Sequence, residues 1–236
     1  MFSGADGSVL YNFVGDSAMD FFGNSVSGAG DVNGDGFADL IVGATGDDNN
    51  GANSGSARVF SGVDGSVLYN FDGDSTGDLF GISVSGAGDV NDDGFDDLIV
   101  GSIFDDNNGS NSGSARLFSG IDGTVLYTFD GGAGNEFGRS VSGAGDVNGD
   151  GVADFIVGAT RGGANLTGHA RVFVSQITVP FILGDANRNG EVDFSDIPAF
   201  IQILQTGTFL DQADCNQDGV VTFADIPAFI AILQAS

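Results

Sequence analysis

Residues 80–102 read F-G-I-S-V-S-G-A-G-D-V-N-D-D-G-F-D-D-L-I-V-G-S, and this stretch decides the fold of the chain. It joins two apolar runs through an acidic loop that contains glycine, and related copies begin at Phe22 and Phe137. The copies are therefore spaced by 58 and 57 residues, a period close to that of some propeller repeats. The sequence predicts an array of three similar units.

Each repeat contains four short runs bounded by Gly, Asp and Asn, the composition of strands separated by turns. In the second copy the runs are residues 83–90, 97–102, 114–118 and 124–129. The Asp64-Gly65 corner and its counterparts in the other repeats predict type I′ hairpin turns, in which both central residues have positive φ. Four antiparallel strands per repeat predict a mainly β fold of three four-stranded blades, a partial β-propeller.

The loop inside each repeat has the form D-x-N-x-D-G-x-x-D, with side-chain oxygens on alternate residues of a tight turn. Calcium takes about six to eight oxygen ligands, so this pattern suits it. The predicted ligands are Asp31, Asn33, Asp35 and Asp39; Asp89, Asn91, Asp93 and Asp97; and Asp146, Asn148, Asp150 and Asp154. The alternative is that Asp, Asn and Gly only form turns. Calcium is favoured because five loops of the chain repeat such offsets.

The other two acidic loops lie near the C-terminus and follow a twelve-residue plan, with a glycine at position 6. The predicted ligands are Asp185, Asn187, Asn189, Asp193 and Asp196 in one loop, and Asp214, Asn216, Asp218, Thr222 and Asp225 in the other. Apolar residues after each loop recur at helical spacing, so a small α-helical domain is expected over residues 184–236. Residues 177–183, interrupted by Pro180, are the predicted linker after a first domain of residues 1–176.

The formal net charge of -27 comes from 33 acidic residues against six basic ones, all of which are Arg. This charge excludes an electrostatic reason to bind nucleic acid and predicts repulsion from anionic membranes. No segment approaches the roughly 20 apolar residues of a membrane span. Cys215 is the only cysteine, so an intrachain disulfide is excluded.

The pairs Phe22-Gly23, Phe80-Gly81 and Phe137-Gly138, each followed by the acidic loop and an apolar run, resemble the FG-GAP repeats of integrin α-subunit propellers. The resemblance covers about residues 1–176. It implies that the loops bind calcium and that Phe37, Phe95 and Val152 each contribute a backbone carbonyl. Propellers close with about four to eight blades, whereas three repeats are present. We therefore expect a fragment of a longer propeller or an arc that closes by self-association, with Ser8–Phe13 available to complete the third blade.

The two C-terminal units resemble a type I dockerin with two F-hand loops, a module that docks cohesin domains. The resemblance implies backbone carbonyl ligands at Glu191 and Val220, up to five calcium ions in the whole chain, and a cohesin-like protein partner. Two pairs depart from the hydroxyl residues frequent at the cohesin-specifying positions 10 and 11: Phe194-Ser195 and Phe223-Ala224.

An enzyme is not expected, because the single histidine, His169, has no nucleophile or orienting partner that recurs near it in the sequence. The favoured function is a non-catalytic calcium-binding protein of the cell surface or extracellular space, in which the blades bind a protein or carbohydrate ligand. The alternative is an accessory or C-terminal part of a polysaccharide-degrading complex. No signal peptide is visible at Met1, so either the natural chain begins upstream or its secretion uses another route.

Overall fold

The computed structural model describes residues 1, 3–162 and 167–175. They belong to the first of the two units into which the chain divides, Met1–Gln176. The predicted linker and the predicted α-helical domain of residues 184–236 lie outside the described residues. Within the described part, no helix has the length and apolar character needed to cross a membrane.

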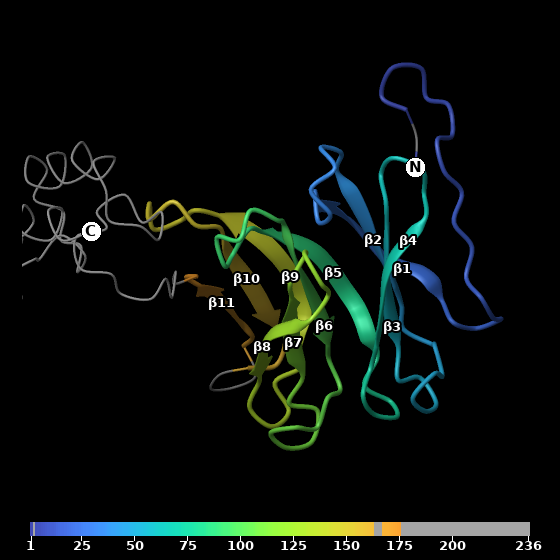
Figure 1. Cartoon of the computed structure of the whole chain (residues 1–236). Helices are drawn as coiled ribbons and strands as arrows, with labels where there is room; N and C mark the ends of the chain where they lie inside the picture. The colour runs from blue at the N-terminus through green and yellow to red at the C-terminus, as the bar shows by residue number, and fades with distance from the viewer. Residues whose placement is uncertain (2, 163–166, 176–236) are drawn as a thin grey trace, which may run out of the picture. The chain divides into compact units, whose positions relative to one another are not determined.

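Three antiparallel sheets follow one another along the chain, and Figure 1 shows them in blue to teal, green, and yellow to orange. Blade 1 contains β1 (Phe22–Gly30), β2 (Asp39–Ala44), β3 (Ser56–Phe60) and β4 (Val67–Asp72). Blade 2 contains β5 (Phe80–Gly88), β6 (Asp97–Ser102), β7 (Ser114–Phe118) and β8 (Val125–Asp130). Blade 3 contains β9 (Phe137–Gly145), β10 (Asp154–Ala159) and β11 (His169–Phe173). Consecutive strands pair within every sheet.

The predicted four-stranded blades are confirmed for blades 1 and 2, whereas the sheet of blade 3 has three strands in the described part of the chain. The segment Ser8–Phe13 does not complete blade 3 within the chain. It lies instead against blade 1, where the Tyr11 hydroxyl donates to the carbonyl oxygens of Gly62 (3.1 Å) and Val63 (2.7 Å). The expectation that this segment would balance the strand count inside one chain is therefore wrong.

The hairpins between the third and fourth strands differ from the predicted type I′ turns. Gly65 has a φ of 75°, but Asp64 is not among the residues with positive φ. The Asp64 carboxylate accepts the Ser66 N–H at 2.9 Å, and the Gly65 N–H donates to the Ser61 carbonyl at 2.9 Å. This local bond to Asp64 lets the hairpin close with glycine as its only left-handed residue.

The apolar cores lie between adjacent blades, because each sheet packs its face on the next sheet. The first core joins blades 1 and 2 and includes Ile41, Val59 and Phe80, each 0 % exposed. The second joins blades 2 and 3 around Phe137, also 0 % exposed. The glycine after each of these phenylalanines permits the approach: a Cβ at Gly81, whose φ is 83°, would collide with the Ser56 carbonyl. The cores therefore link the blades into one row.

Arginine recurs at equivalent positions of the three blades, at Arg58, Arg116 and Arg171. Arg58 pairs with Asp16, and Arg116 pairs with Asp74 at 2.8 Å. Each of the three arginines also lies over the phenylalanine of the F-G pair in its own repeat, with the Arg116 guanidinium carbon 4.7 Å from the centre of the Phe80 ring. The guanidinium groups of Arg58 and Arg116 thus combine ion pairs with cation–π contacts.

Candidate calcium loops

The three predicted calcium loops connect the first and second strands of each blade. Loop 1 (Asp31–Asp39) joins β1 to β2, loop 2 (Asp89–Asp97) joins β5 to β6, and loop 3 (Asp146–Asp154) joins β9 to β10. The strand before each loop ends at a glycine with positive φ, such as Gly88 at 79°. Because a left-handed residue ends the extended strand there, the next residues are free to form the turn.

Loop 2 turns its polar side chains inward over its own backbone. The Asp93 N–H donates to Asp89 Oδ1 (3.0 Å) and to Asn91 Oδ1 (3.1 Å), and the Gly94 N–H donates to Asp89 Oδ2 at 2.8 Å. The Phe95 N–H donates in turn to Asp93 Oδ1 at 3.0 Å. Positions 1, 3 and 5 of the loop therefore share one ring of backbone donors.

Loops 1 and 3 repeat this arrangement. In loop 1 the Asp35 N–H donates to Asp31 Oδ1 and Asn33 Oδ1, both at 3.0 Å. In loop 3 the Asp150 N–H donates to the equivalent oxygens at 3.1 and 2.9 Å. These N–H donors favour the ionised carboxylate, and the Gly151 N–H is the main cause of the lowered pKa of Asp146. The recurrence shows that the motif specifies one loop conformation.

The last aspartate of each loop lies beneath it, fully buried, at the start of the second strand. Asp97 Oδ2 accepts the Val90 N–H at 2.9 Å, and its Oδ1 accepts the Gly120 N–H at 3.0 Å. Burial raises the pKa of Asp97 to about 6 and also raises the pKa of Asp39. This carboxylate ties the loop to the hairpin that joins the third and fourth strands.

The donor set fits calcium, because the side chains at positions 1, 3, 5 and 9 offer oxygen alone. Positions 1, 3 and 5 already converge through their shared backbone donors, and position 9 stands within the same loop. The loop carboxylates do not form a group of three whose oxygens all lie within 4.8 Å of one another in the described residues. Bound calcium would have to draw them closer, so the ligand assignment remains a prediction. The residues predicted to bind calcium between Asp185 and Asp225 lie outside the described part.

Successive loops contact each other along one end of the row. The Asp31 N–H of loop 1 donates to Asp96 Oδ2 of loop 2 at 2.7 Å, and the Asp96 N–H donates to the Asp31 carbonyl at 3.2 Å. Between loops 2 and 3 the backbone bond is kept, from the Ala153 N–H to the Asp89 carbonyl at 3.3 Å. The side-chain bond has no counterpart here, because loop 3 has Ala153 at the position that Asp96 occupies in loop 2.

One acidic cluster was not predicted from the sequence. Asp74, Asp78 and Asp105 hold carboxylate oxygens all within 4.8 Å of one another at the junction of blades 1 and 2. Asp78 is 5 % exposed, and burial, the hydrogen bond with Asp74 and repulsion by Asp105 raise its pKa to about 7. Arg116 pairs with Asp74 on the same cluster. The signal available in the sequence was the recurrence of aspartate at Asp16, Asp20 and Asp47 in the preceding repeat.

Comparisons with known proteins agree with the two modules. The FG-GAP repeat family matches residues 22–60 and 137–174, and the dockerin type I domain family matches residues 183–233. Integrin alpha-5 of Xenopus laevis is 32% identical over 174 residues, which cover 66% of this chain and 16% of the integrin. Integrin alpha-11 of Homo sapiens is 32% identical over 152 residues, covering 59% of this chain and 12% of the integrin.

The chain thus spans less than a fifth of these relatives. Both matched families bind calcium. The blades in the structure, their acidic loops and the two family matches lead to one assignment. The chain consists of integrin α-like FG-GAP repeats followed by a type I dockerin domain.

Proposed function

We propose that this protein is a non-catalytic, calcium-dependent binding or scaffold protein that acts outside the cell or at its surface. The blades present a surface for a protein or carbohydrate ligand, and the C-terminal domain attaches the chain to a cohesin-type partner. The observation that carries the proposal is the order of the two modules, FG-GAP repeats and then a dockerin type I domain over residues 183–233.

The loop geometry supports a requirement for calcium in the first module. Each loop gathers acidic side chains that repel one another when they are ionised together, and a bound cation would offset that repulsion. Extracellular modules commonly bind calcium at roughly 10⁻⁴ to 10⁻³ M, concentrations that the cytosol does not maintain. Calcium dependence and the dockerin match both support a secreted or surface location.

The tether is tested with the full chain and a panel of immobilised, purified type I cohesin domains. Binding in calcium and release by chelator are expected. The double variant Asp185→Ala/Asp214→Ala removes the first predicted ligand of both dockerin loops and should abolish binding. Asp31→Ala is the matched control, because it changes a predicted ligand in blade 1 and should leave cohesin binding intact. Calcium-independent binding, or binding that survives the double variant, would contradict the proposed tether.

A second candidate is an accessory or C-terminal part of a polysaccharide-degrading complex, and the dockerin match favours it. The two candidates differ in what a longer natural form would do. Release of reducing sugar by such a form, lost when sequence upstream of these blades is removed, would favour the second candidate. Calcium-dependent binding without any sugar release would favour the scaffold.

A further inference from the structure

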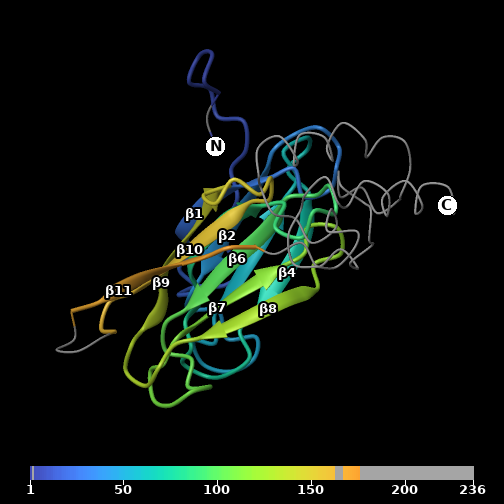
Figure 2. The same cartoon turned by 90° about the vertical axis from the view of Figure 1, so that its left-hand side faces the viewer.

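Within the described residues no strand pairs with the outer edge of β11, which Figure 2 shows beside β10, whereas the equivalent edges of β3 and β7 are paired. In blades 1 and 2 the third strand pairs on both sides, with β4 or β8 on its outer edge. Among the described residues, β11 pairs with β10 alone. Val172 of β11 is 51% exposed, whereas its equivalents Val59 and Leu117 are 0% and 1% exposed. An unpaired edge beside an exposed valine is a template for another strand.

The N-terminal segment repeats the sequence of the outer strand of blade 1. Residues 8–13 read S-V-L-Y-N-F, as do residues 66–71 that lead into and form most of β4. The N-terminal segment also contacts blade 1 as β4 contacts blade 2. The Phe13 and Phe60 rings stack at 4.0 Å, and the Phe71 and Phe118 rings stack at 4.1 Å. Ser8–Phe13 therefore occupies the position of an outer strand of a blade that precedes blade 1.

Both end faces of the row expose valines whose equivalents are buried between blades. Each sheet has a front face, which packs on the preceding blade, and a back face, which packs on the following one. Val84 on the front of blade 2 is 7% exposed, whereas the equivalent Val26 on blade 1 is 68% exposed. On the back face, Val32 and Val90 are 0% and 5% exposed, whereas Val147 on blade 3 is 54% exposed.

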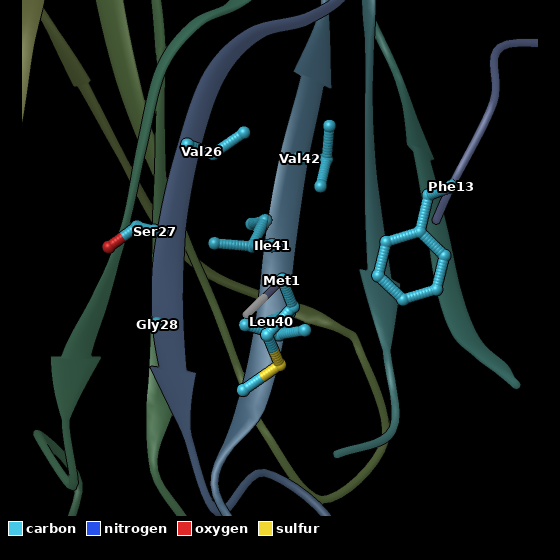
Figure 3. Close-up of a pocket in the computed structure, with 8 residues that line it drawn as sticks. All are labelled: Met1, Phe13, Val26, Ser27, Gly28, Leu40, Ile41 and Val42. Carbon is cyan, nitrogen blue, oxygen red and sulfur yellow. The ribbon is translucent and has the colours of Figure 1, made fainter. Parts of the chain in front are cut away.

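A pocket marks the uncovered front face. It measures about 370 Å³ and is lined by Val26, Leu40, Val42 and their neighbours on β1 and β2, together with Met1 and Phe13 of the N-terminal segment. Figure 3 shows Val26 and Val42 side by side above Leu40, with the Phe13 ring beyond β2. In blade 2 the equivalent face is covered by the back face of blade 1.

We propose that two copies of this chain associate head to tail, with the back of blade 3 of each copy packed on the front of blade 1 of the other. Ser8–Phe13 of one copy becomes the fourth strand of blade 3 in its partner. The β7–β8 register fixes the pairing, because Leu117 lies opposite Tyr127 and Arg116 opposite Thr128. By equivalence, Val172 of one copy lies opposite Tyr11 of the other, and Arg171 opposite Asn12.

Two observations bear on the number of copies in the assembly and on the hydrogen bonds that association must break. A head-to-tail contact gives a ring or an open filament, and two copies give six blades, within the range of about four to eight seen in propellers. In this structure Met1 and Ser3 pair with Ser8–Phe13 along the edge that β11 of the partner would take. The Met1 amino group donates to the Tyr11 carbonyl (3.0 Å), the Met1 carbonyl accepts the Leu10 N–H (2.9 Å), and the Ser3 N–H donates to the Ser8 carbonyl (2.7 Å). Association replaces these three bonds with a complete strand pair.

The first test measures the mass of the full chain by sedimentation over a range of concentrations. A dimer of the 23.8 kDa chain is expected. Val26→Asp or Val172→Asp alone should weaken the dimer at least about 100-fold, because each buries an unpaired charge. An equimolar mixture of the two variants should recover a heterodimer through its one intact interface. Val125→Asp is the matched control, since Val125 is 52% exposed on the central blade and should not affect the mass.

The second test checks the register with disulfides in a Cys215→Ser background. Asn12→Cys combined with Arg171→Cys should link two chains, while Asn12→Cys with Val172→Cys should not, since adjacent strand residues point to opposite faces. A monomer at all concentrations would overturn the proposal and leave both end faces to further blades of a longer chain. Failure of the variant mixture to recover, or crosslinking only in the shifted pair, would also overturn it.

Discussion

The buried carboxyl of Asp78 makes the stability of the blades depend on pH. Its pKa in the folded chain is about 7, against an ordinary value of 3.8. A raised pKa means that the neutral form is favoured in the folded state. Its contribution to stability is therefore complete below about pH 4 and is lost as pH rises through 7. A shift of roughly three units corresponds to at most about 4 kcal/mol, at about 1.4 kcal/mol per unit.

Asp78→Asn removes this charge while keeping the size of the side chain, and its amide can donate to Asp74 or Asp105. We expect the variant and the parent to have similar free energies of unfolding near pH 4, and the difference between them to grow as the pH rises from 4 to 7. At pH 8 the variant should be more stable by about 2 to 4 kcal/mol, because the parent must hold three adjacent carboxylates ionised. Arg116 offsets that repulsion only in part.

The measurement is urea unfolding followed by circular dichroism at several pH values, with chelator present so that calcium does not contribute. Asp20→Asn is the matched control, because Asp20 is the equivalent residue of blade 1 and is only half-buried; a change below about 1 kcal/mol is expected there. A variant no more stable than the parent at pH 8, or one with an unchanged pH dependence, would refute the reasoning.

Three further predictions concern the loops and the packing between blades. Calorimetric titration of the chelator-stripped chain should count about five calcium ions, and Asp89→Ala should reduce the count by one; an unchanged count would remove loop 2 from the predicted sites. Phe80→Ala should lower the free energy of unfolding by about 3 to 5 kcal/mol, because the ring is fully buried and lies under Arg116; a loss below about 1 kcal/mol in urea unfolding would show that the core tolerates the cavity. Gly81→Ala should cost more than Gly77→Ala in the same assay, since both have positive φ but only Gly81 faces a backbone carbonyl; equal losses would assign the effect to φ alone.

Local patterns predicted the elements whose limits are set by nearby residues. The expected strands 97–102 and 114–118 coincide with β6 and β7, because charged and glycine-containing loops bound both. The strand expected to begin at Ser83 begins at Phe80 instead, and its pairing shifts between Phe80 and Ser83, at the positive-φ Gly81. Simple alternation of apolar residues does not reveal such an irregularity.

The recurrence of residues between repeats marks equivalent positions, but it does not show which distant segments meet in the fold. The acidic cluster of Asp74, Asp78 and Asp105 forms only when the segment before β5 contacts the segment after β6. The spacing of these residues along the chain does not predict that contact. The position of Ser8–Phe13 was missed for a similar reason. The segment lies where an outer strand would lie, but it forms no strand in the structure, and its pattern does not say which blade it will contact.

The bond from the Asp31 amide to Asp96 makes the first two loops mechanically interdependent. When loop 2 is immobilised, the Asp96 carboxylate that accepts the Asp31 N–H is fixed in place. Ordering loop 1 then costs less conformational entropy. By thermodynamic reciprocity, order in loop 1 assists loop 2 to the same extent. Loop 3 has Ala153 at the equivalent position and stands outside this side-chain link. Three nearly identical motifs thus form a cooperative pair and a third loop that responds more independently.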